Sequence, residues 1–513
     1  MPKEELIRDY LADNLAVLED GLELIQKEYR LPNEKGTTGR IDILARDTYG
    51  HLVIIEVKRS EQASRQALHE LFKYMALLRT NSGLPPEQIR CMLVSTHWDE
   101  LLVPYSDFIS QVEYPVTGYQ IEVDEDGAIL SFEKIIPVEQ PPESELCEEH
   151  ICYFYEKPQS RAVGLKSAVA NLETLEIFHY CIIEFDYTGS NSQVIYPYAI
   201  YIVLDKFNET KKRQVKDELG LSYDEQALEN NPWIIESEIL GVLGLTIPKK
   251  DTETGFPEKF TAMLEEWDPV RITRNGRLDK AKLIISDSQL KREIAGITGS
   301  NSQQFFSQAT PQYPLSWNRL REKAQYCLSD NEAWSYTFDW TMEKIQEMYP
   351  NSTVSVAIYN PADILRTLYL LTSRLDHRYS PLMEIVIETG SSEGTVLVVG
   401  SVIWNSKHIN ESAVEFISKC FGDVHKYFWE SHLGLVRFKE PFVCYYLGLE
   451  YNTAWIEFSD NEAPEVSILE MDERGDIVYT ESDTNKSLLE FVEQNSGFLL
   501  QWGQLFSENS YGI

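Results

Sequence analysis

The fold of the first part of this 513-residue chain is indicated most clearly by the segment Gly39-Arg-Ile-Asp-Ile-Leu-Ala-Arg-Asp-Thr-Tyr-Gly-His-Leu-Val-Ile-Ile-Glu-Val-Lys-Arg59. It predicts two apolar strands joined by a turn at Thr48-Tyr49-Gly50. The second strand, Leu52-Val-Ile-Ile55, is apolar on both faces, which is typical of a buried central strand. Residues i and i+2 of a strand point to the same face, so we expect Glu56 and Lys58 to project together.

Two carboxylates are expected to meet at the end of this hairpin. If the pairing brings Asp42 alongside Glu56, the two acids form a hard-oxygen site suited to Mg²⁺ or Mn²⁺, with the Val57 carbonyl as a third ligand. Lys58 would then orient or activate a water nucleophile, or stabilise the charge that develops on the phosphoryl group. The pattern therefore predicts phosphodiester hydrolysis. The alternative is a structural salt-bridge cluster, but buried carboxylates without a partner are costly, which favours a metal.

A helix predicted from Gln62 to Thr80 follows the hairpin. It places Glu70 and Tyr74 one turn apart on one face. We expect both side chains to line the same cleft as the acids and the lysine.

These residues carry a family resemblance. Asp42, the triplet Glu56-Val57-Lys58 and the following helix resemble the PD-(D/E)xK nucleases, and within them the catalytic domain of the NucS/EndoMS-type endonucleases. The similarity covers about residues 1–120. It implies a restriction-endonuclease-like α/β domain, a mixed sheet flanked by helices, with divalent-metal-dependent endonuclease activity on DNA. RNA stays open as a substrate, since DNA is favoured only by the resemblance.

The resemblance also implies a helix-borne acid that assists the metal. In this chain it falls on Glu4 or Glu5, and we take Glu5 as the candidate. The family usually has Gln four residues before the tyrosine, where this chain has Glu70. The family also carries a DNA-binding and dimerisation domain ahead of the nuclease. Here the nuclease segment comes first, so mismatch recognition is not implied.

The charge of the chain is strongly acidic, at −36. Residues 1–110 hold 13 Lys and Arg against 18 Asp and Glu, a net of −5, so the other 403 residues carry −31. Such a balance opposes binding to a polyanion. We expect nucleic acid to meet a basic strip in the first domain, formed by Arg40, Arg59, Arg65, Lys73 and Arg79, while the acidic remainder repels nonspecific DNA.

The length predicts about three domains. Residues 1–136 form the nuclease domain, residues 150–298 a second α/β or α+β module, and residues 315–513 a carboxy-terminal module for sensing or assembly. The first break is the proline-rich, acidic stretch Pro137–Glu145. The second is Gly299–Pro314, which contains no charged residue.

The remaining sequence features indicate the cellular location and the biological role of the protein. We expect no membrane span because no apolar run approaches the roughly 18–20 residues required. The acidic start is unlike a signal peptide, and seven scattered cysteines are typical of reduced cytoplasmic thiols. We expect an effector of prokaryotic genome defence, controlled by a protein partner or by homo-oligomerisation through the acidic modules. The alternatives are a structure-specific repair endonuclease and a non-catalytic nucleic-acid-binding scaffold with a vestigial nuclease fold.

Overall fold

The computed structural model describes residues 4–32, 38–59, 61–82, 88–112, 114–124, 128–138, 146–189, 194–223, 231, 233–374, 379–389, 395–432, 435–458, 463–471, 476–480 and 486–509. The chain divides into two compact units, Met1–Glu143 and Ser144–Ile513. Within the described ranges, no helix combines the length and the apolar character that crossing a bilayer requires.

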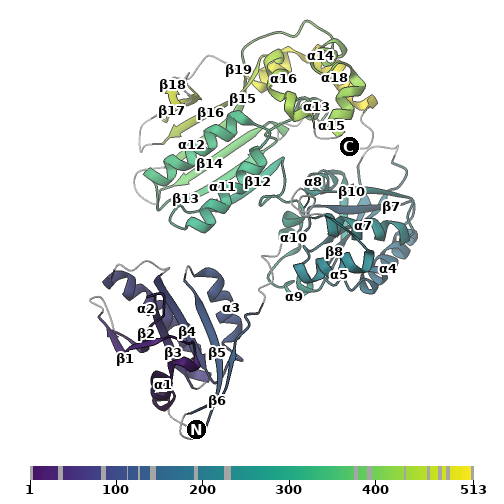
Figure 1. Cartoon of the computed structure of the whole chain (residues 1–513). Coiled ribbons are helices and arrows are strands. Elements are labelled where there is room, and N and C mark those ends of the chain that lie inside the picture. The colour runs from purple at the N-terminus through teal and green to yellow at the C-terminus, as the bar shows by residue number, and fades with distance from the viewer. Residues whose placement is uncertain are drawn as a thin grey trace. The chain divides into compact units, whose positions relative to one another are not determined.

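The first unit is a six-stranded mixed sheet with helices on both faces (Figure 1). Its strands lie in chain order from β1 to β6; β1, β2 and β3 are antiparallel, β3, β4 and β5 are parallel, and β6 is antiparallel to β5. The elements are α1 (Glu4–Asp13), η1 (Leu15–Val17), β1 (Glu23–Leu31), β2 (Gly39–Arg46), β3 (Leu52–Lys58), α2 (Glu61–Ser82), β4 (Ile89–Ser95), α3 (Leu102–Gln111), β5 (Val116–Val123) and β6 (Ile129–Lys134). The predicted pair of strands and the helix after them are confirmed.

Two apolar layers enclose β3, as its sequence predicts. On one face, Ile7 and Leu11 of α1 pack in the same cluster as Val53 and Ile55. On the other, Leu71 of α2 packs with Ile54 and with residues of α3. Alternate residues of β3 therefore enter different cores, and the strand is buried along its length.

The turn between β2 and β3 is held by Asp47. Its carboxylate accepts hydrogen bonds from the amides of Tyr49 and His51 at 3.0 and 2.9 Å, and Arg90 of β4 lies 2.7 Å from it. Gly50 has φ of 90°, a backbone conformation that disfavours residues with a Cβ. This turn fixes the register in which Ile43 pairs with Ile55.

The second unit begins with a five-stranded antiparallel sheet in the order β10-β7-β9-β8-β11. One face packs against α4, α5 and α7, and the other against α8, α9 and α10. The elements are β7 (His150–Tyr155), α4 (Pro158–Thr174), β8 (Tyr180–Tyr187), β9 (Tyr198–Leu204), α5 (Glu209–Leu219), α7 (Ile234–Thr246), β10 (Asp251–Gly255), α8 (Pro257–Glu266), β11 (Trp267–Asn275), α9 (Arg277–Lys280) and α10 (Asp287–Ile294).

A second antiparallel sheet follows in the order β12-β13-β14-β15-β16-β17-β18, with β19 paired to β15. Helices α11 and α12 pack on it through one apolar cluster, and α13 to α18 gather around another (Figure 1). The elements are β12 (Gln304–Ala309), α11 (Pro314–Leu328), α12 (Glu332–Met348), β13 (Thr353–Tyr359), α13 (Ile364–Arg374), β14 (Leu382–Glu388), β15 (Thr395–Trp404), α14 (Ala413–Phe421), α15 (Val424–His432), η4 (Val436–Lys439), α16 (Glu440–Leu447), β16 (Leu449–Glu457), β17 (Glu465–Met471), β18 (Ile477–Thr480), β19 (Lys486–Ser487), α17 (Leu488–Gln494) and α18 (Ser496–Asn509).

The break expected at Gly299–Pro314 differs from the structure, because β12 lies inside it and pairs with β13 along its whole length. Phe305 and Asn301 are buried, and the Asn301 side chain donates to the Ala295 carbonyl at 2.7 Å. An uncharged polar segment is therefore used here as an edge strand and not as a linker. The first expected break, Pro137–Glu145, falls where the two units divide, but residues 139–145 lie outside the described ranges.

Candidate active site

The site begins where the pairing of β2 with β3 ends. The last paired residues on this side are Ile43 and Ile55. Beyond them, the Val57 amide donates to Asp42 Oδ2 at 2.9 Å. A carboxylate thus takes the place of a backbone acceptor, which fixes Asp42 beside the second strand as the hairpin predicts.

Glu56 and Lys58 project together, as their spacing requires. Lys58 Nζ lies 2.6 Å from Glu56 Oε1 and 2.6 Å from Glu70 Oε2, so a lysine on β3 bridges acids on β3 and α2. Glu56 is 1% exposed and Lys58 7%. The sequence prediction that these three side chains meet is therefore confirmed.

The carboxylates carry more negative charge than Lys58 can offset. Burial and then the charge of Asp42 raise the pKa of Glu56 well above its ordinary value. Burial raises the pKa of Asp42 to about 6, and the charges of Glu4 and Glu70 add to the rise, against the Val57 amide and Lys58, which lower it. In addition, Glu56 Oε2 is buried with no hydrogen-bond partner among the described residues. This is the electrostatic state of a site that favours an added cation.

Glu4, and not Glu5, is the helix-borne acid that reaches this place. Glu4 Oε2 accepts a hydrogen bond from the Arg59 amide at 3.3 Å, whereas the Glu5 side chain is exposed. The choice of Glu5 is therefore corrected. The physical reason is the helical periodicity of α1. Glu4 lies three residues before Ile7 and seven before Leu11, so it is on the same helix face as these two residues, which pack α1 on the sheet.

Tyr74 lies beside the acids but has a structural contact. Its hydroxyl donates to the Arg40 carbonyl at 2.5 Å, which ties α2 to the start of β2. The side chain is 4% exposed, and burial, followed by the charges of Glu56 and Glu70, raises the pKa of its hydroxyl. Tyr74 thus helps to hold α2 against β2 next to the site.

The structure describes the side chains of Arg40, Arg59 and Lys73 from the predicted basic strip. The Arg40 side chain is 55% exposed but forms an ion pair with Glu28, and Lys73 Nζ donates to the Thr38 carbonyl at 3.0 Å. The side chains of Arg65 and Arg79 lie outside the described residues.

Arg59 is fixed through its backbone at the end of β3. Its amide binds Glu4, and its carbonyl accepts from Thr96 Oγ1 at 2.6 Å. Sequence reasoning missed Thr96; the available signal is that it directly follows β4, the parallel neighbour of β3.

The donor set fits a hard divalent cation. Asp42 and Glu56 supply carboxylate oxygens, one of them unpartnered, and the Val57 carbonyl is adjacent in the chain. The described part of the chain contains no group of three or more His, Cys, Asp or Glu arranged to hold a metal. Glu70, an acid of α2 near this site, is paired with Lys58.

Residues 3–100 match the family described as the Endonuclease NucS C-terminal domain. The segment is 37% identical over 67 residues to Endonuclease NucS of Sulfolobus acidocaldarius, covering 13% of this chain and 24% of that protein. It is 32% identical over 83 residues to Endonuclease NucS of Mycobacteroides abscessus, covering 16% and 33%. The chain thus spans about a quarter to a third of the length of these curated relatives.

Two solved structures are also similar over part of their length. A repair endonuclease from Pyrococcus abyssi shares 20% identity with a TM-score of 0.18, over 23% of this chain and 48% of that one. A complex of EndoMS with double-stranded DNA shares 20% identity with a TM-score of 0.17, over 23% and 44%. The relationship to NucS-type endonucleases therefore rests on the sequence match, which contains the whole candidate site.

Proposed function

We propose that the first unit is a divalent-metal-dependent endonuclease of the PD-(D/E)xK type that cleaves DNA. The observation that carries this proposal is the meeting of Asp42, Glu56 and Lys58 at the end of one hairpin, where Glu56 Oε2 is buried with no hydrogen-bond partner among the described residues. The match of residues 3–100 to an endonuclease domain supports the same reading.

Asp42, Glu56 and the Val57 carbonyl would hold Mg²⁺ or Mn²⁺. When bound, such an ion polarises a phosphoryl oxygen and lowers the pKa of water. Lys58, held between Glu56 and Glu70, offers a positive charge to the non-bridging phosphate oxygens and orients the attacking water. Because its two carboxylate neighbours raise the pKa of Lys58 despite burial, it acts as an ammonium group and not as a base.

The acidic second unit has a restraining role in this proposal. Its charge lowers the affinity of the whole chain for DNA, so activity in the cytoplasm would depend on a protein partner or on self-assembly. A nuclease that stays inactive until a partner binds or the protein assembles would suit genome defence. The second candidate function is that of a structure-specific endonuclease in DNA repair, since residues 3–100 match the domain of an endonuclease.

A cleavage assay with Mg²⁺, Mn²⁺ or EDTA tests the proposal on supercoiled, linear, branched and single-stranded DNA and on RNA. We expect a metal-dependent cut in DNA that falls about 100-fold or more in Lys58→Met. Lys27→Met, which changes a partly exposed lysine of the same unit, is the control. Undiminished cutting by Lys58→Met would overturn the assigned site. Preference for branched DNA over plain duplex would favour repair.

A further inference from the structure

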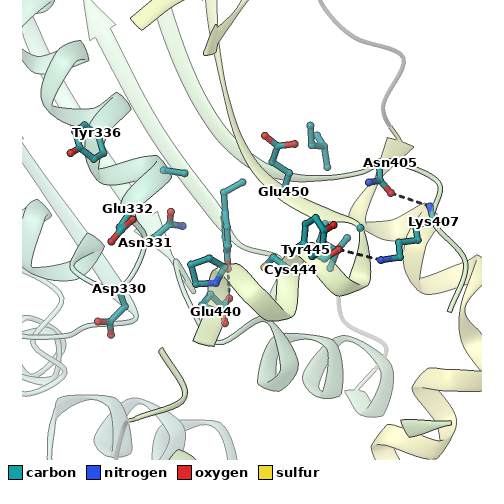
Figure 2. Close-up of a pocket in the computed structure, with 16 residues that line it drawn as sticks. Asp330, Asn331, Glu332, Tyr336, Asn405, Lys407, Glu440, Cys444, Tyr445 and Glu450 are labelled. Carbon is teal, nitrogen blue, oxygen red and sulfur yellow. Dashed lines mark hydrogen bonds between the residues drawn. The ribbon is translucent and has the colours of Figure 1, made fainter. Parts of the chain in front are cut away.

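The second unit contains a cavity of about 680 Å³ that the nuclease proposal does not use. It lies where the start of α12, the chain after β15 and the corner between α16 and β16 meet (Figure 2). Its volume is within the range of small-molecule sites, which is roughly 300–1,000 Å³.

Among the charged residues of the lining, acids outnumber bases. Asp330, Glu332, Glu440 and Glu450 contribute four carboxylates, whereas Lys407 contributes the one basic group of the described lining. Figure 2 shows Asp330 and Glu332 on one side of the cavity and Lys407 beyond Tyr445 on the other. A ligand that occupies the acidic side must therefore offset negative charge.

Glu440 is the deepest of these acids, at 5% exposure. Its Oε1 accepts hydrogen bonds from the Ile364 amide at 2.9 Å and the Tyr451 hydroxyl at 2.8 Å. Both contacts use the same carboxylate oxygen. Burial and then the charge of Asp363 raise the pKa of Glu440 to about 7. Besides burial, the strongest influences on this carboxylate are the charges of Asp363 and Asp330, the Tyr451 hydroxyl and the Ile364 amide, and none of these groups is a cation.

Aromatic rings complete the cavity. Tyr336 and Tyr445 are 59% and 73% exposed, so a ligand can reach both rings, and Lys407 lies over one of them. Lys407 Nζ lies 5.5 Å from the centre of the Tyr445 ring, so this ring already accepts a cation from the chain. Carboxylates combined with aromatic faces are the groups that recognise organic cations.

The wall next to Tyr445 is formed by two segments of the chain that contact each other closely. Gly448 has φ of 72°, and a Cβ there would lie 2.3 Å from Asn405 Oδ1. The Asn405 amide donates to the Gly448 carbonyl at 3.0 Å, and the Lys407 amide donates to Asn405 Oδ1 at 3.1 Å. The segments around Asn405 and Gly448, far apart in sequence, are therefore hydrogen-bonded to each other at this side of the cavity.

We propose that this cavity binds a small organic cation, an amine or guanidinium group on an apolar stem. The charged group would be held by Glu440 with the rim acids Glu332 and Glu450, and the stem would pack on Tyr445. This inference is independent of the nuclease proposal, since every residue it uses belongs to the second unit.

Calorimetric titration of the full chain with spermidine and agmatine tests the inference. Glutarate, an anion, and 1,6-hexanediol, a neutral stem, are the ligand controls. We expect saturable binding of at least one of the two cations and of neither control. The exposed double variant Glu332→Gln/Glu450→Gln should weaken binding about tenfold or more, and Glu440→Gln and Tyr445→Leu should weaken it in the same direction.

The matched control is Glu343→Gln/Glu347→Gln, which removes two equally exposed charges from α12 outside the cavity. Unchanged binding in this variant supports the site. Absence of saturable binding by both cations would overturn the inference. An equal loss in the cavity and control variants would also overturn it, because general charge attraction would then explain the binding. Equal binding of hexanediol would overturn the requirement for a cation.

Discussion

Replacing Glu440 by Gln should make the carboxy-terminal part of the second unit more stable at neutral and alkaline pH. The pKa of Glu440 is about 7 in the folded protein against an ordinary value of 4.5. That difference corresponds to roughly 3 kcal/mol of folding free energy. Because the folded pKa is raised, the neutral carboxyl is the favoured form. The contribution of this group to the free energy of unfolding is fully present below pH 4.5 and is lost as the pH rises through 7.

The glutamine side chain keeps an oxygen for the Ile364 amide and the Tyr451 hydroxyl but cannot ionise. We therefore expect Glu440→Gln to exceed the parent in unfolding free energy by roughly 3 kcal/mol more at pH 8 than at pH 4.5. Hydrogen exchange of the amides in α16 and β16, corrected for the intrinsic rate at each pH, measures this locally. Glu343→Gln, on an exposed part of α12, is the control. A difference between variant and parent that is the same at both pH values would refute the reasoning.

Three further predictions concern the first unit and its boundary. Glu70→Gln should keep its cleavage rate within about tenfold of the parent, because Lys58 retains its contact with Glu56. It should change the free energy of unfolding by less than about 1 kcal/mol, since Glu70 is partly exposed. A loss of cleavage as large as in Lys58→Met would contradict this prediction. Limited proteolysis should cut between Lys134 and His150 before it cuts in β12, because strand pairing protects the latter; early cleavage in β12 would contradict the fold. A fragment of residues 1–143 should bind a DNA duplex more tightly than the whole chain at low salt, and the difference in affinity should shrink as salt rises. Weaker binding of the fragment at every salt concentration would instead indicate that the second unit binds DNA.

The local pattern of the sequence was sufficient to predict the centre of the candidate site. Apolar runs on both sides of a short turn predicted β2 and β3, and strand periodicity then put Glu56 and Lys58 on one face. Helical spacing added Glu70. All three predictions depend on neighbours in sequence or on a tight hairpin, which is why they needed no knowledge of the tertiary packing.

Features set by packing between distant segments were not predictable in this way. Whether Glu4 or Glu5 faces the site depends on how Ile7 and Leu11 dock α1 on the sheet. The polar composition of β12 gave no strand signal, because its pairing with β13 and not its own pattern makes it a strand. The cavity of the second unit combines residues more than 100 positions apart, such as Glu332 and Glu440.

The rate of Mn²⁺-dependent DNA cleavage by Glu56→Gln tests most directly whether Asp42, Glu56 and Lys58 form a nuclease site. This change removes the buried carboxylate with the unpartnered oxygen while keeping its size, and the purified protein should remain folded because a buried charge is lost. Glu23→Gln, an exposed acid of the same unit, serves as the control. We expect Glu56→Gln to cut DNA at least about 100-fold more slowly than the parent and the control at saturating metal. A folded Glu56→Gln protein that cuts at the parental rate would contradict this expectation.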